Sequence, residues 1–419
     1  MSGRWSGIAL AIALASQSPA WAQIPHAALP DQLTLPVLLL LVAERSPRLA
    51  VEQVAIDSAQ AERITAGARP NPTISYGRFS PSGGASTLFD GNRQHQTTLD
   101  LPLLLGGQRG ARIEAAQQGI LAARARVGLA GNELALRAAD LFVGLQAAQE
   151  KAVLLGQSLA EIERVVAVVS GRLESGAASR FDLARVEIEL AGMNARLAEA
   201  QADLAEKSAG LATLLGAPGW RPSASGTAAP TGLSLSAAEW RGALIASNPQ
   251  IVAARREEDA AQAALKRSER ERWPVPVLSV GRTWTSDPFG AANFVGVSTE
   301  IPLSDAWRGL MAKSAADLRA AQRRREAIES EADVELQRLL DALAQRRATL
   351  ERFRRNVGER IPALKQMAED AYRLGRGSLL ELIDAARSRL DARLTEVDLR
   401  AATVAQELRI LGLTGKLGG

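Results

Sequence analysis

The sequence repeats its own pattern once, with a period of about 200 residues, and this repeat limits the possible folds more than any other feature. Five pairs of matching segments keep the same order along the chain: Ser46-Pro47-Arg48-Leu49 with Asn248-Pro249-Gln250-Ile251, Pro70 and Pro72 with Pro274 and Pro276, Leu99-Asp100-Leu101-Pro102-Leu103 with Thr299-Glu300-Ile301-Pro302-Leu303, Gly176 and Asp182 with Gly375 and Glu381, and Leu214-Leu215-Gly216 with Leu413-Thr414-Gly415. Chance matches would not stay in order over nearly the whole chain. The sequence therefore predicts two copies of one structural unit.

Each copy is predicted to begin with a helix, over about 35–68 and 236–272, and proline ends each helix. Two short stretches with alternating apolar and polar residues follow and predict a β-hairpin in each copy. The expected strands are 73–79 and 94–102 in the first copy, and 275–284 and 293–302 in the second, with turn-rich segments at 80–92 and 285–292 between them.

A very long helix is predicted after each hairpin, because apolar residues recur there at alternating spacings of three and four, as in a coiled-coil seam. The first long helix, 111–173, would be about 95 Å long at about 1.5 Å per residue. The second carries the same rhythm over 336–357. Breaks at 171–179 and 374–378 precede shorter return helices, so each copy is expected to form an antiparallel coiled coil.

The N-terminal residues predict a secretory signal peptide, 1–22. Arg4 precedes an apolar core over 5–15, and Ala20-Trp21-Ala22 provides a cleavage site, so the mature chain would begin at Gln23. No later stretch reaches about 18 consecutive apolar residues, and no transmembrane helix is predicted.

Composition excludes several classes of function. The chain has no cysteine, which excludes disulfides, thiol nucleophiles and cysteine metal sites. Its 50 basic and 46 acidic residues nearly balance, so charge gives no reason to expect a nucleic-acid interface. Neither histidine, His26 or His95, has a partner at metal-ligand spacing, and no catalytic set or cofactor motif is present.

The two hairpins predict oligomerisation. Four strands cannot close a barrel, and an isolated hairpin is marginally stable in water. An exported chain that enters a membrane without an apolar helix must do so as a closed barrel. Several copies of this chain would have to supply its strands.

This order of elements resembles the TolC-type outer-membrane efflux proteins over about 35–415. The most specific shared motif is a glycine followed six residues later by an acid and then an apolar residue, which stands as Gly176…Asp182-Leu183 and Gly375…Glu381-Leu382. The segments Ala68-Arg69-Pro70-Asn71-Pro72 and Leu105-Gly106-Gly107-Gln108-Arg109 resemble the CzcC-type branch, which serves heavy-metal efflux pumps.

The resemblance implies a mainly α fold with a small β part, assembled as a homotrimer. Its hairpins would form one twelve-stranded β-barrel in the outer membrane, with 80–92 and 285–292 as external loops, and the helices would continue the barrel as a periplasmic tube. The expected organisation is a signal peptide 1–22, an N-terminal extension 23–34, repeat one 35–216 with hairpin 73–102, an equatorial linker 217–235, repeat two 236–415 with hairpin 275–302, and a C-terminal tail 416–419.

The implied function is a passive channel without a cofactor, which is not an enzyme. Its expected partners are outer-membrane lipid, a periplasmic adaptor and an inner-membrane pump of the RND type. Divalent heavy-metal cations are the preferred cargo. Drug efflux and type I protein secretion stay open as alternatives, and a periplasmic coiled-coil scaffold is less favoured because it would not need two amphipathic hairpins.

Glu381 and Asp384 are the main candidate pore residues. They are three positions apart at the start of a return helix and so share a face. The resemblance places them at the inner constriction, where a trimer would set six carboxylates around one axis and attract cations. Asp182 is the counterpart in the first copy. The alternative is structural, since acids in the first turn of a helix interact favourably with its dipole.

The turns before the return helices carry the remaining candidates. Relatives hold a basic latch residue where this chain has Gly377, so the neighbouring Arg376 is the possible latch. Adaptor docking is expected at the glycines of the tips, Gly176 and Gly375, with Ser175 and Leu374 beside them. The alternative for the glycines is that they only permit a tight turn.

Overall fold

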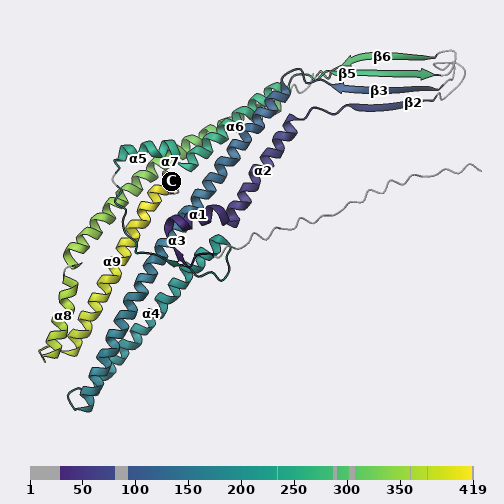
Figure 1. The fold of residues 1–419 in the computed structure, drawn as a ribbon. Helices are drawn as coiled ribbons and strands as arrows, with labels where there is room; N and C mark the ends of the chain where they lie inside the picture. The colour runs from purple at the N-terminus through teal and green to yellow at the C-terminus, as the bar shows by residue number, and fades with distance from the viewer. Residues whose placement is uncertain are drawn as a thin grey trace, which may run out of the picture.

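The computed structural model describes residues 29–80, 93–233, 235–285, 290–301, 307–358, 360–374 and 376–417. The predicted signal peptide 1–22, nearly all of the expected external loop 80–92, half of the expected loop 285–292, and the tip residue Gly375 lie outside these ranges. The described chain is a long helical body with a flat β-sheet extending from one end (Figure 1).

The two copies contain the same elements in the same order. The first has α1 (Leu35–Arg45), α2 (Pro47–Gly67), β2 (Thr73–Phe79), β3 (Gln94–Pro102), α3 (Gln108–Glu174) and α4 (Arg180–Leu215). The second has α5 (Ala237–Ser247), α6 (Pro249–Glu271), β5 (Val277–Thr285), β6 (Ala291–Ser298), α7 (Arg308–Phe353), a π-helical segment (Arg354–Gly358), α8 (Arg360–Arg373) and α9 (Leu379–Leu413). Two short strands, β1 (Gln32–Leu33) and β4 (Ser223–Ala224), pair in parallel and tie the linker between the copies to the N-terminal segment.

The prediction of one opening helix per copy is wrong, because each is split one residue before a proline. Ser46 and Asn248 have ψ angles of 119° and 122°, which are extended. Proline disfavours helical geometry in the residue before it, and then starts the next helix without losing a hydrogen bond. Asn248 also caps α6, since its side-chain oxygen accepts a hydrogen bond from the amide of Ile251 at 2.8 Å.

These breaks explain the repeated glycines at the ends of the return helices. Gly216 has a φ of 62°, and a Cβ there would lie 2.7 Å from the ring of Pro47. Gly415 has a φ of 67°, and a Cβ there would lie 2.3 Å from the carbonyl oxygen of Ser247. In each copy, therefore, the return helix ends directly against the break in the opening helix, and only glycine leaves room for this contact.

The four long strands form one antiparallel sheet in the order β2-β3-β5-β6. The first hairpin lies at its predicted residues, whereas β5 begins two residues after the predicted start and β6 covers 291–298 instead of 293–302. Pro276 has no amide hydrogen to give to the ladder. The last pair therefore joins Val277 to Ser298, which ends the second hairpin early.

The two faces of the sheet differ in polarity. One face carries two apolar rows, which are Ile74-Leu99-Val280-Val295 and Leu101-Leu278-Val297. The opposite face is mainly polar or small and includes the row Thr73-Asp100-Ser279-Gly296, in which the hydroxyl of Ser279 donates to the carboxylate of Asp100 at 2.5 Å. Such alternation is typical of strands that have lipid on one side and water on the other.

The helical body is built from two antiparallel coiled coils that lie side by side (Figure 1). The predicted seam is buried along α3, for example at Leu155 and Val169. At 67 residues, α3 is about 100 Å long. Its counterpart in the second copy is not continuous, because the π-helical segment at 354–358 separates α7 from α8.

Ion pairs fasten the second coiled coil to the first. The α3 residues Glu150, Lys151 and Glu161 pair with Arg400, Asp398 and Arg389 of α9. Arg387 of α9 forms two hydrogen bonds to the buried carboxylate of Glu189 on α4. Because the partners run in opposite directions along the two antiparallel helices, the pairs specify the register between the copies.

Candidate pore tip

The first tip is the turn between α3 and α4. Gly176 adopts a φ of 73°, and the amide of Ala177 donates to the carbonyl of Arg172 at 2.7 Å, so the turn closes α3 with its own backbone. Ser175 uses its hydroxyl to donate to the same carbonyl at 3.0 Å. A left-handed glycine in this place is a common way to end a helix. The turn-forming interpretation of Gly176 is confirmed.

Asp182 forms a capping box with Ser179 at the start of α4. The amide and hydroxyl of Ser179 donate to its carboxylate at 3.0 and 2.7 Å, and the amide of Asp182 donates back to the hydroxyl at 3.1 Å. Hydrogen bonds from the Ser179 side chain and then its amide hold the pKa of the Asp182 carboxyl below its usual value. Asp182 is therefore charged at neutral pH and serves its own helix.

The second tip repeats this chemistry. The amide of Ser378 donates to the Glu381 carboxylate at 3.0 Å, and the Glu381 amide donates to the Ser378 hydroxyl at 3.3 Å. Leu374 is 63% exposed, as a docking residue would have to be. A Cβ on Gly377 would lie 3.0 Å from that of Ala371 and 3.2 Å from the carboxylate of Glu381, so glycine here leaves room for the cap.

Asp384 and Arg376 both have exposed side chains. Asp384 lies nearly one turn after Glu381 and makes no hydrogen bond or ion pair with the part of the chain that the structure describes. Within the same part of the chain, the Arg376 guanidinium has no acidic partner, whereas its backbone amide donates to Ala371 at 2.9 Å. Both side chains are therefore available for contacts beyond one subunit.

The two tips share one apolar core near their ends. Its buried residues come from three helices: Ile162 and Val169 of α3, Val186 of α4, and Leu379 and Ile383 of α9. This core brings the start of α4 and the start of α9 together. Asp182 and Glu381 therefore cap two neighbouring helices at the same end of the molecule (Figure 1).

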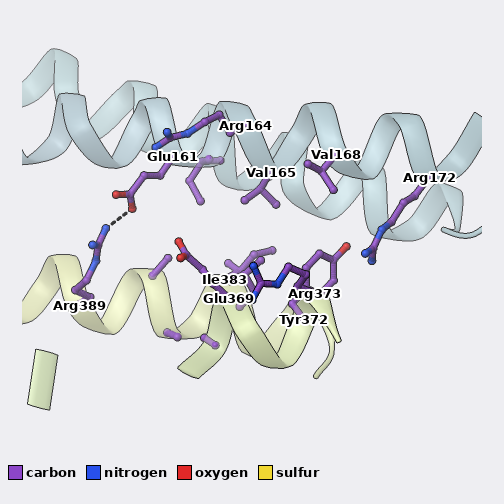
Figure 2. A pocket seen from close by; sticks show the side chains of 15 residues that line it. Glu161, Arg164, Val165, Val168, Arg172, Glu369, Tyr372, Arg373, Ile383 and Arg389 are labelled. Carbon is purple, nitrogen blue, oxygen red and sulfur yellow. Dashed lines mark hydrogen bonds and ion pairs between the residues drawn. The ribbon is translucent and has the colours of Figure 1, made fainter. Parts of the chain in front are cut away.

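A groove between the copies, just above the tips, was not predicted from the sequence (Figure 2). It has a volume of about 530 Å³ and is lined by α3, α8 and α9. Arg172 lies over the ring of Tyr372 with 4.5 Å between the guanidinium carbon and the ring centroid, and Glu161 pairs with Arg389 across the groove. The sequence offered one signal for this groove, since Tyr372 is one of only 2 tyrosines in the chain and a rare aromatic residue can mark a contact.

The described residues contain no group of three or more histidine, cysteine, aspartate or glutamate side chains placed to hold a metal ion. Across those same residues, no helix is both long enough and apolar enough to cross a membrane.

A chain with duplicated coiled coils, an amphipathic four-stranded sheet and acid-capped tips has the architecture of an outer-membrane channel subunit. The family described as outer membrane efflux protein matches residues 38–217. The chain belongs to this family, and it is accordingly part of a passive channel and not an enzyme.

Among individual relatives, the nickel and cobalt resistance protein CnrC of Cupriavidus metallidurans is 30% identical over 330 residues, which cover 77% of this chain and 75% of that protein. The cobalt-zinc-cadmium resistance protein CzcC of the same species is 25% identical, over 86% of this chain and 85% of its own length. The pyoverdine export outer membrane protein OpmQ of Pseudomonas putida is 27% identical, over 90% of this chain and 87% of that protein.

Solved structures share the fold. The outer membrane protein VceC of Vibrio cholerae superposes with a TM-score of 0.72 at 19% identity, over 92% of this chain and 96% of that one. At this identity the similarity concerns the fold alone.

Proposed function

We propose that this chain is the outer-membrane subunit of a tripartite efflux system and that three copies form its channel. The sheet carries the proposal. It has one apolar face and one polar face, and four strands are too few to close a barrel. Three copies would supply twelve strands, with the apolar face toward lipid and the face of Asp100 and Ser279 toward water.

The helical bodies would then continue the barrel as a tube through the periplasm, with the linker 217–235 as a belt around it. Export requires the signal peptide 1–22, and the extension 23–34 and the tail 416–419 flank the repeats 35–216 and 236–415. A periplasmic adaptor and an inner-membrane pump of the RND type are the proposed partners at the tips. Gly176, Gly375, Ser175 and Leu374 are the proposed docking residues.

We assign Glu381 and Asp384 to the narrowest part of the closed channel. The exposure of Asp384, and the neighbouring position of the Asp182 cap, support this assignment. In the trimer, the carboxylates would form a ring that attracts cations. Arg376, unpaired with the residues described in this chain, is the proposed latch to a neighbouring subunit.

Divalent heavy-metal cations are the proposed cargo. Similarity to the two resistance proteins from Cupriavidus metallidurans supports this choice. The similarity to a pyoverdine exporter favours a small organic cargo as the second candidate. A conducting channel needs no tight metal site, since strong binding would slow transit.

The test is the survival of a deletion strain on graded nickel, cobalt, zinc and cadmium, beside a panel of hydrophobic drugs. Selective sensitivity to metals, restored by the intact gene, is the expected result. Sensitivity to drugs alone would retain the channel and reject the metal cargo. Failure of the purified chain to form trimers that conduct in planar bilayers would reject the channel itself.

A further inference from the structure

The apolar face of the sheet changes character toward the hairpin ends, which are the ends farthest from the helical body (Figure 1). Beyond the two apolar rows, the register gives a row with Tyr76, Thr97 and Arg282, and then a row with Arg78, His95 and Trp284. We call Tyr76, Arg78, His95, Arg282 and Trp284 the outer band. Successive rows on one face are about 7 Å apart along the strands.

The aromatic members of the outer band form one connected surface. The hydroxyl of Tyr76 and Nδ1 of His95 share a hydrogen bond of 2.7 Å, and the rings of His95 and Trp284 stack with centroids 5.5 Å apart. Tyrosine and tryptophan favour the boundary between lipid tails and headgroups, because their rings are apolar and their tips are polar. The band therefore marks the level of the lipid headgroups.

The two arginines of the band give this level a positive charge. The Arg78 and Arg282 side chains are exposed, and neither makes an ion pair with any residue that the structure describes. The described strands also place no acid on this face, since Asp100 lies on the opposite one. Arginine binds phosphate through two parallel hydrogen bonds, so a phosphate group is the complementary ligand.

The apolar rows next to the two arginines indicate whether the phosphate group belongs to a lipid or is a free ion. A ligand held by the arginines has apolar side chains directly beside it along the strands, including Val280 and Val295, which are 41% and 72% exposed. A free phosphate ion gains nothing from them, whereas acyl chains would cover them. We infer that the outer band binds the phosphate group of a membrane lipid headgroup, with the acyl chains of the lipid packed along the apolar rows. This inference rests on the proposed insertion of the sheet into the outer membrane.

The test compares binding of diphosphoryl lipid A to detergent-purified wild type, Arg78→Gln/Arg282→Gln and Arg78→Lys/Arg282→Lys, with inorganic phosphate as competitor. Arg180→Gln/Arg185→Gln, which removes two exposed arginines from α4 at the tip, is the matched control. The double glutamine variant is expected to bind lipid A about tenfold more weakly, which equals about 1.4 kcal/mol. The lysine variant is expected to retain most of the affinity, and the control all of it.

Equal binding by an assembled double glutamine variant would overturn the inference and leave the channel untouched. Competition by inorganic phosphate at concentrations equal to lipid A would also overturn it, because the site would then recognise an aqueous anion. Heat-modifiable trimers in the outer-membrane fraction are scored first for every variant. If the wild type forms no such trimers, the proposed function is refuted before lipid binding is measured. A failure of the proposed function can therefore be distinguished from a failure of the lipid-binding inference.

Discussion

Among the residues that the structure describes, Glu407 on α9 has the most deeply buried carboxylate. Its removal should allow the linker between the copies, 217–235, to open more often. Its side chain is 1% exposed. Its two oxygens accept hydrogen bonds from the amide and hydroxyl of Thr231 at 2.7 and 2.8 Å, and from Arg347 at 2.5 Å. Arg347 also donates to the carbonyl of Leu233 at 2.9 Å. One carboxylate thus joins the linker to both α7 and α9.

The expected cost of Glu407→Ala follows from this geometry. Removing one partner of a buried ion pair typically costs about 3–5 kcal/mol, because the other groups stay buried without a partner. Here the Arg347 side chain is 34% exposed and can be hydrated in part, whereas the Thr231 amide loses its acceptor. We therefore expect a loss near the lower end, about 3 kcal/mol, which corresponds to about a hundredfold in an opening equilibrium.

Hydrogen exchange of peptides that contain Thr231, measured on the assembled protein, reports this opening directly. The control is Glu335→Ala, which removes a pair with Arg338 on the surface of α7, where the two side chains are 41% and 64% exposed. Surface pairs contribute at most about 1 kcal/mol, and the control should leave exchange at Thr231 unchanged. A change below about threefold in Glu407→Ala would refute the reasoning, because other contacts would then hold the linker.

Three further predictions concern the pore, the pH dependence of stability and the backbone. Glu381→Ala combined with Asp384→Ala should leave trimers intact and weaken block by multivalent cations in planar bilayers; unchanged block would contradict the pore assignment. Burial raises the pKa of Asp140 by more than a nearby arginine lowers it, so the folded chain keeps this proton where the unfolded chain has lost it. The contribution of Asp140 to stability therefore falls as pH rises above 3.8. Asp140→Asn should therefore gain in urea midpoint relative to wild type between pH 3.5 and pH 7, and a relative loss would contradict the sign. Gly415→Ala should lower the free energy of unfolding by at least about 2 kcal/mol more than Gly219→Ala does. Both glycines have a positive φ, but only a Cβ at position 415 would clash with backbone atoms. Equal urea midpoints for the two variants would contradict this prediction.

The regular spacing of apolar residues was sufficient to predict those helices and strands that bury one continuous face. The first hairpin and the α3 seam were found because their apolar residues recur with one period over many positions. The helix breaks at Ser46 and Asn248 were missed since the apolar pattern continues across them, although the prolines that follow were a usable signal. The π-helical segment was missed for the same reason, because Leu350, Phe353 and Val357 keep the expected spacing through it.

The candidate site could be predicted only in part. The capping boxes have a local signature, a serine three residues before Asp182 and before Glu381, and the sequence contains it plainly. The contact of Arg172 with Tyr372 has no local signature, because it joins residues of different copies and depends on the lateral register of two coiled coils. Such contacts follow from packing, which a single sequence does not display.

The pairing of β3 with β5 crosses the boundary between the two copies, and it has a consequence for the assembly of the proposed ring of three chains. Two separate half-length chains would have to make the same contact between molecules, so that a ring of six identical pieces would replace a ring of three. When the two halves are joined in one chain, matching positions of the first and second copies can carry different residues, and these residues would alternate around the ring. The position of Asp384 holds Arg185 in the first copy, which six identical halves could not achieve. In the proposed trimeric channel, fusion would thus let one end of the tube carry two alternating chemistries.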